Sequence, residues 1–70
     1  MEERIINEVQ KWRLDKGATQ EELAEAVGVT RQTIIAIEKG NYTPSVLLSL
    51  KIAGYFKTSV EKLFKLNYAK

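Results

Sequence analysis

The segment TQEELAEAVGVTRQTIIAIEKG, residues 19–40, constrains the fold of this chain more than any other. Thr19 followed three positions later by Glu22 is a capping box, which predicts that a helix begins there. Gly28 can take the left-handed conformation that ends a helix, and Thr30 is placed to cap the next one. The segment therefore predicts two short helices, over about 20–27 and 31–39, joined by a glycine turn.

The rest of the chain predicts three more helices. Asn7 with Gln10 fits the capped start of a helix that runs to about Lys16. Ser45, directly after Pro44, and Ser59 are placed to cap two further helices, over about 46–56 and 60–64. In the first of these the apolar residues expected to face mostly inward are Leu47, Leu50, Ile52, Ala53 and Phe56.

Near the C-terminus the pattern changes to period two. Phe64, Leu66 and Tyr68 are apolar, and the residues between them are polar. This alternation predicts a short strand that could pair with residues 4–6, although a lone two-stranded ribbon is weak unless it packs on helices. We therefore expect a mainly all-α domain with a possible ribbon joining the two chain ends.

Composition excludes several classes of protein. Seventy residues make one domain, over 1–70, and the sequence contains no Cys and no His, so disulfides and the usual zinc or haem ligands are excluded. The acidic start MEERIINEVQ is no signal peptide, and no apolar run could span a bilayer, so we expect a cytoplasmic protein with no membrane contact. Glu21, Glu22 and Glu25 read as solvated charge near a helix start rather than a catalytic or metal-binding cluster. We expect no enzyme activity and no cofactor.

The 31–39 helix carries two unlike faces. At about 100° per residue, Ile34 and Ile37 lie together and should face the core. The opposite side, expected to be exposed, consists of Arg31, Gln32, Ile35, Ala36 and Lys39. Arg can bond guanine O6 and N7, Gln can bond adenine N6 and N7, and a small Ala lets a helix sink into the groove. Ile35 either touches thymine methyl groups or is a tolerated surface residue.

Four residues are candidate contacts to DNA phosphates. Gln20 stands at the start of a helix, where backbone N–H groups favour anions. Lys39, Asn41 and Tyr42 follow at the far end of the 31–39 helix, although Tyr42 could instead pack on the next helix. Two short helices at a glycine turn, the second with a polar reading face, are the layout of a helix-turn-helix DNA-binding motif.

The sequence resembles the Cro/phage-repressor, or xenobiotic-response-element, class of helix-turn-helix regulators. The matching residues are Arg13, the 19–40 segment, Pro44-Ser45 and the ending from Ala53 to Phe64. The resemblance implies a five-helix, lambda-repressor-like domain that regulates transcription. It places base contacts at the first, second and sixth positions of the recognition helix, Arg31, Gln32 and Ala36, with Thr33 as a lesser candidate. Ala36 departs from that role because its side chain cannot hydrogen-bond.

The resemblance also implies a structural ion pair between Arg13 and Glu38. The Ile-Ile-Asn leader further resembles the cytolysin-repressor branch, which implies a terminal ribbon and a homodimer. The C-terminal segment, about 58–70, holds more apolar residues than so small a core should need, so it is the expected dimer interface; they are Val60, Leu63, Phe64, Leu66 and Tyr68. The alternative is that these residues only close the core of the monomer.

The function that these observations favour is sequence-specific binding of double-stranded DNA by a transcriptional regulator. A single domain reads one half-site, so we expect a homodimeric repressor on a pseudo-palindromic operator. Neither an activation domain nor a small-molecule effector site is evident. A protein-interaction role, as the antitoxin of a toxin–antitoxin pair or as a coactivator adapter, remains the alternative. Salt would separate the two, because DNA binding should weaken steeply as salt rises.

Overall fold

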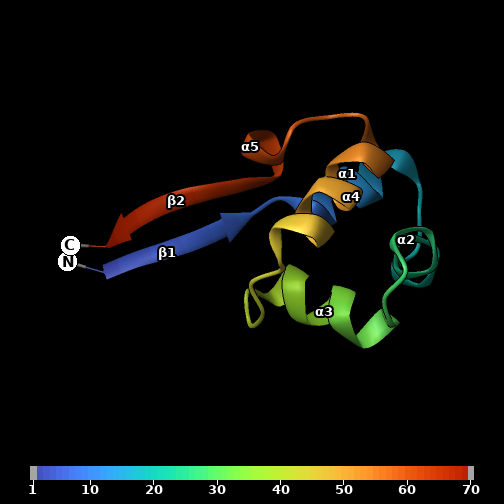
Figure 1. The fold of residues 1–70 in the computed structure, drawn as a ribbon, viewed down its shortest axis with the longest axis horizontal. Coiled ribbons are helices and arrows are strands. Elements are labelled where there is room, and N and C mark those ends of the chain that lie inside the picture. Colours follow the sequence, from blue (N-terminus) through green and yellow to red (C-terminus); the bar gives the residue numbers. More distant parts are fainter. Residues whose placement is uncertain (1, 70) are drawn as a thin grey trace.

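Five helices form the body of the described protein, and a two-stranded antiparallel ribbon extends away from it (Figure 1). The computed structural model describes the backbone of residues 2–69 and the side chains of residues 3–67. In chain order the elements are β1 (Glu2–Asn7), α1 (Val9–Lys16), α2 (Gln20–Val27), α3 (Arg31–Lys39), α4 (Val46–Phe56), α5 (Val60–Leu63) and β2 (Phe64–Ala69). The mainly helical fold class is confirmed.

The expected ribbon is present and is longer than the sequence predicts. Each strand has six residues, and Ile5 lies opposite Leu66 while Arg4 lies opposite Asn67. A backbone hydrogen bond of 2.8 Å from Glu8 N to Leu63 O ties the base of the ribbon to α5. The ribbon is thereby anchored at one end, and its other end points away from the helices (Figure 1).

The helix ends follow the local signals in the sequence. Thr19 Oγ1 accepts from Glu22 N at 3.0 Å and Glu22 Oε1 accepts from Thr19 N at 2.8 Å, which completes the capping box. The hydroxyl groups of Thr30 and Ser45 accept from backbone N–H groups three residues ahead, at 3.3 and 3.1 Å. Gly28 ends α2 at a φ of +78°, a conformation that glycine adopts without strain.

Two expected caps differ from the structure. The cap position of α1 is Glu8, one residue later than expected; Ser59 does occupy the cap position of α5, but its side chain makes no capping hydrogen bond. Asn7 instead bridges two elements: its Oδ1 accepts from Val9 N at 3.2 Å and its Nδ2 donates to Ile37 O at 2.8 Å. The second bond satisfies a carbonyl group near the end of α3, so Asn7 fixes α3 against the start of α1.

The core lies where the five helices meet. Each helix contributes at least one side chain without accessible surface, or nearly so; the largest are Val9, Leu23, Ile34, Ile37, Ile52 and Leu63. In α4, Ile52, Ala53 and Phe56 face inward as expected, whereas Leu47 and Leu50 are 65% and 57% exposed. The expectation for these two leucines is wrong. Because α4 is apolar on nearly every side, its pattern does not fix which side faces the core.

Candidate nucleic-acid interface

The orientation of α3 is set by its buried side. Ile34 and Ile37 have no accessible surface, and α3 packs chiefly on α2. The turn between them is closed by a hydrogen bond of 3.0 Å from Val29 N to Ala24 O. With these two isoleucines inside, the opposite face of α3 is turned outward along one edge of the helical body (Figure 1).

The outward face begins with two long polar side chains. Arg31 and Gln32 are both exposed on the first turn of α3. Thr33 is half-buried, and its hydroxyl group lies 3.1 Å from that of Thr30, so it helps to cap the helix. Arg31 and Gln32 therefore offer the free hydrogen-bonding groups that base edges in a major groove require.

The middle of that face is less exposed than expected. Ile35 and Ala36 are half-buried, where the sequence suggests an open position for each. Ile35 is thus not a fully exposed surface residue, and it retains only part of its side chain for an apolar contact. Because Ile35 is half-buried and Ala36 is small, the side chains in the middle of this face project less than those of Arg31 and Lys39 at its ends.

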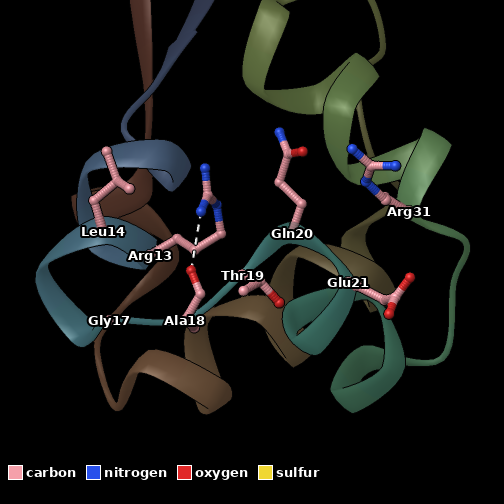
Figure 2. Close-up of a pocket in the computed structure, with 8 residues that line it drawn as sticks. All are labelled: Arg13, Leu14, Gly17, Ala18, Thr19, Gln20, Glu21 and Arg31. Atoms are coloured by element: carbon pink, nitrogen blue, oxygen red, sulfur yellow. Dashed lines mark hydrogen bonds between the residues drawn. The ribbon is translucent and has the colours of Figure 1, made fainter.

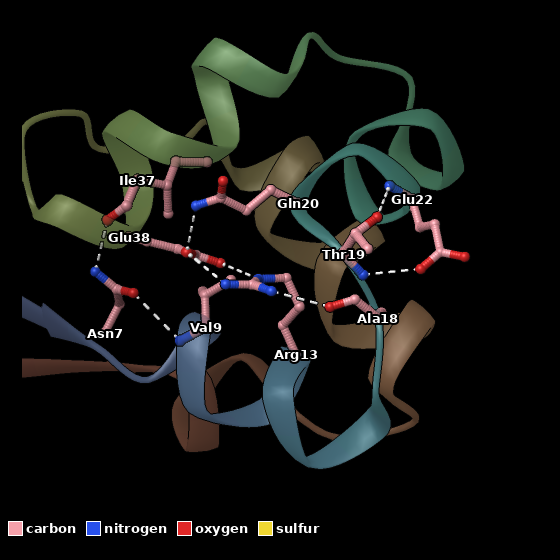
Figure 3. Close-up of polar contacts among 9 residues, drawn as sticks. All are labelled: Asn7, Val9, Arg13, Ala18, Thr19, Gln20, Glu22, Ile37 and Glu38. Atoms are coloured by element: carbon pink, nitrogen blue, oxygen red, sulfur yellow. Dashed lines mark hydrogen bonds and ion pairs between the residues drawn. The ribbon is translucent and has the colours of Figure 1, made fainter.

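A buried ion pair holds the C-terminal half of α3 (Figure 3). Arg13 Nε lies 2.7 Å from Glu38 Oε2, and these two side chains are only 9% and 4% exposed. Arg13 also donates from Nη2 to Glu38 Oε1 at 3.2 Å and from Nη1 to the carbonyl oxygen of Ala18 at 2.9 Å. The pair thus joins α1, the connection from α1 to α2, and α3 at one place, so its role is to position these segments.

Gln20 belongs to the same network. Its Nε2 donates to Glu38 Oε1 at 3.0 Å, and its side chain is half-buried. This differs from the expectation of an amide free to meet a phosphate. Figure 2 shows the polar ends of Gln20 and Arg31 directed the same way at an open hollow of about 660 Å³ beside the first turn of α2. An anion in this hollow would face Arg31 and the positive end of α2, and it would also meet Glu21 in the same lining.

The far end of α3 presents the other expected phosphate contacts. Lys39, Asn41 and Tyr42 are all exposed, and Tyr42 retains 48% of its surface. A second hollow, between the ribbon and this end of α3, is lined by Lys39 and by Arg4 of β1. Sequence reasoning missed Arg4 because its place beside Lys39 depends on how the ribbon lies against the end of α3, a tertiary contact that no local pattern in the sequence encodes.

The expected dimer residues are divided between core and surface. Leu63 is fully buried, and Val60 and Phe64 are half-buried against the same core. Leu66 is 54% exposed, and the side chain of Tyr68 lies outside the described ones. The expectation is wrong for Leu63, because a residue that fills its own core has no surface to offer a partner.

Two further classes of site are absent from the described part of the chain. It contains no helix that is long and apolar enough to cross a membrane. Its acidic residues nowhere gather in a group of three that could hold a metal ion.

A capped helix, a glycine turn and a second helix anchored by its inner face define a helix-turn-helix DNA-binding protein. The sequence profile of the family described as "Helix-turn-helix" matches residues 9–63. A Bacillus subtilis HTH-type transcriptional regulator, YgzD, is 53% identical over 61 residues, 87% of this chain and 92% of its own length. A Methanocaldococcus jannaschii HTH-type transcriptional regulator is 50% identical over 58 residues, 83% of this chain and 88% of its own length.

Solved structures agree on the fold. The restriction-modification controller protein C.AhdI from Aeromonas hydrophila matches with a TM-score of 0.75 and 30% identity, over 80% of this chain and 85% of its own. The transcriptional regulator VanUg matches over 99% of this chain and 92% of its own with a TM-score of 0.78, and at 23% identity it shows the fold alone. The chain belongs to the helix-turn-helix family of the Cro/C1, or XRE, type, and it is a transcriptional regulator with a DNA-binding domain rather than an enzyme.

Proposed function

We propose that this protein represses transcription as a homodimer that reads a pseudo-palindromic operator, with α3 in the major groove. Arg31 and Gln32 would read base edges, with Ile35, Ala36 and Thr33 forming the apolar and small surface around them. At one end the phosphate contacts would come from the first turn of α2 and from the second N–H of Gln20, whose first donates to Glu38. At the other end they would come from Lys39, Asn41 and Tyr42.

The observation that carries this proposal is that α3 has one exposed polar side and one side held firmly by the core. Arg31 and Gln32 are exposed, while the other side of α3 is held by Ile34, Ile37 and the buried Arg13–Glu38 pair. A helix that is rigidly placed and still offers unpaired donors suits recognition, because little order is lost on binding. Repression would follow from occupying the operator, and the protein would act where the chromosome lies, in the cytoplasm.

A salt-titrated binding assay tests the proposal. The probes are the DNA upstream of the protein's own gene and a scrambled duplex of the same length. Gln32→Ala should remove most of the preference for the first probe, a loss on the order of 10-fold or more for one bidentate base contact. Gln10→Ala, which alters an exposed glutamine on α1, is the matched control and should bind like the wild type.

The outcome decides between the two functions considered. A steep salt slope with a preference lost only in Gln32→Ala supports operator reading. Equally weak binding of both probes, unchanged by Gln32→Ala, would overturn it for this DNA and favour a protein partner on the α3 face.

A further inference from the structure

Helix α4 carries apolar side chains on the side that faces away from the core. Val46, Leu47 and Leu50 are 77%, 65% and 57% exposed, and the exposed Gly54 continues the row by one turn. At about 100° per residue these four positions fall within one arc of about 100° around the helix. We call them the α4 stripe.

The folded protomer does not account for this stripe. The opposite side of α4 already supplies the core with Leu48, Ile52 and Phe56. A helix that is apolar on both sides is normally covered on both sides. The stripe exposes apolar surface on the order of a few hundred Å², the size at which patches on small proteins mark an interaction site.

Gly54 is the most informative member of the stripe. It lies inside α4, where glycine is a poor helix former, and its backbone does not need a positive φ. A Cβ built at this position meets no atom within 4 Å, so no close contact within the protomer requires a glycine. A close approach of a backbone from another molecule would explain why glycine occupies this position.

We propose that the α4 stripe is the surface through which two copies of this chain pair, with the two α4 helices crossing at Gly54 and Leu50. This deepens the proposed function and rests on it, because it names the contact that makes the homodimer. The four stripe positions hold no charged residue, and the exposed Lys51 lies at their margin, so the apolar centre of this surface can meet its own copy across a two-fold axis.

The surroundings of the stripe favour a second copy over another partner. A hollow beside it is lined by apolar side chains that include Leu47 of the stripe and Val29, with Ser45 and Lys51 at its polar side, and it can receive a side chain from the partner. Two such surfaces with their polar rims approach the roughly 1,000 Å² that a specific interface buries.

The position of α4 gives the pairing a consequence for DNA binding. Residues 40–45 alone separate α3 from α4, so a contact between two α4 helices also fixes the distance between two α3 helices. A dimer of this family class needs that distance to match one turn of DNA, about 34–36 Å.

The test compares two leucines that are about equally exposed on different helices. Leu50→Glu alters the stripe, and Leu14→Glu alters α1, where Leu14 is 61% exposed. Sedimentation equilibrium should show that Leu50→Glu raises the dimer dissociation constant at least 100-fold and that Leu14→Glu leaves it unchanged. A Leu50→Glu protein that dimerises like the wild type, or a wild type that stays monomeric at millimolar concentration, would overturn the proposal.

A second variant covers the case in which Leu50→Glu fails to fold. Gly54→Leu exchanges a poor helix former for a good one at an open position, so a lone protomer should tolerate it. At a close dimer contact the same change should raise the dissociation constant at least 10-fold. Unchanged dimerisation of Gly54→Leu would exclude a close approach at Gly54 and overturn the proposal.

DNA binding separates failure of this interface from failure of the proposed function. If the α4 stripe is the dimer interface, Leu50→Glu should still bind a single half-site as the wild-type protomer does. It should lose only the additional affinity that the wild-type dimer gains from binding two half-sites at once. If Leu50→Glu remains dimeric and binds the full operator, the interface is wrong and the operator-binding function stands.

Discussion

At the scale of single residues, Arg13 does more than pair with one carboxylate. Its guanidinium group donates to both oxygens of Glu38 and to the carbonyl oxygen of Ala18, so three chain segments share one cation. Gln20 adds a third hydrogen bond to the same carboxylate. Because charges this deeply buried are stable only when fully paired, the network fixes one arrangement of α1, α2 and α3.

Removing one partner of this pair should therefore be severe. Glu38→Ala leaves the Arg13 guanidinium buried without its counter-charge, and we expect the free energy of unfolding to fall by about 3–5 kcal/mol. Urea denaturation followed by circular dichroism measures it. Glu25→Ala, at an exposed position on α2, is the control and should change stability by no more than about 0.5 kcal/mol. A fall below about 1 kcal/mol for Glu38→Ala would contradict a buried pair.

Thr58 presents the opposite case of a polar group without a partner. Among the described side chains, its Oγ1 is the one buried polar atom that lacks a hydrogen bond. Thr58→Val keeps the shape and removes the unsatisfied hydroxyl group, so we expect a gain of about 1 kcal/mol in unfolding free energy. Thermal melts of this variant and of Thr43→Val, which alters an exposed threonine, would show it. A lower melting temperature for Thr58→Val would mean that the hydroxyl group has a partner.

At the scale of elements, the sequence predicts best where a local signal marks an end. The capping box at Thr19 and the glycine at position 28 place α2 and its turn correctly. The inner face of α3 follows from the spacing of Ile34 and Ile37. These features depend on neighbours along the chain, which a single sequence displays directly.

The sequence predicts less well where the outcome depends on tertiary contacts. Leu50 of α4 is exposed because the core takes another side of an evenly apolar helix. Gln20 turns to Glu38, a residue 18 positions away, and Asn7 turns to Ile37, 30 positions away. No periodicity encodes such partners. The exposed residues of the candidate DNA interface could therefore be predicted from the sequence, whereas the hydrogen bonds by which Gln20 and Asn7 hold α3 in place could not.

The ribbon is the element that we expect to open most easily. A two-stranded ribbon has few partners, and Ile5, Ile6 and Leu66 remain about half exposed. Native-state hydrogen exchange should show the backbone amide groups that pair β1 with β2 at least 100-fold less protected than that of Ile37 in α3. Equal protection of the ribbon and α3 would mean that another surface covers the ribbon in solution.

At the scale of the whole molecule, the proposed tasks fall on separate surfaces. The outward face of α3 presents Arg31 and Gln32, and the α4 stripe lies on a different helix next along the chain. The ribbon adds Arg4 beside Lys39 at the end of α3. If both proposals hold, this chain reads DNA and pairs with its copy through elements that share one core.

This arrangement predicts a strict dependence on operator spacing. In a rigid dimer the two α3 helices face the same side of the duplex at a fixed separation, so both can enter the major groove only when the half-sites are in phase. Inserting about 5 base pairs between the half-sites turns one of them to the opposite side of the DNA, and affinity should fall to the level of one half-site.

A gel-shift titration with a footprinted operator measures the effect. The matched control is a duplex with the same 5-base-pair insertion placed outside the two half-sites, which should bind as the original does. A dimer joined by a loose tether would tolerate the central insertion, because its two reading heads could reorient independently. Unchanged affinity after the central insertion would therefore count against a rigid two-fold contact, whereas loss of affinity confined to that insertion would show that protein symmetry and operator symmetry are matched.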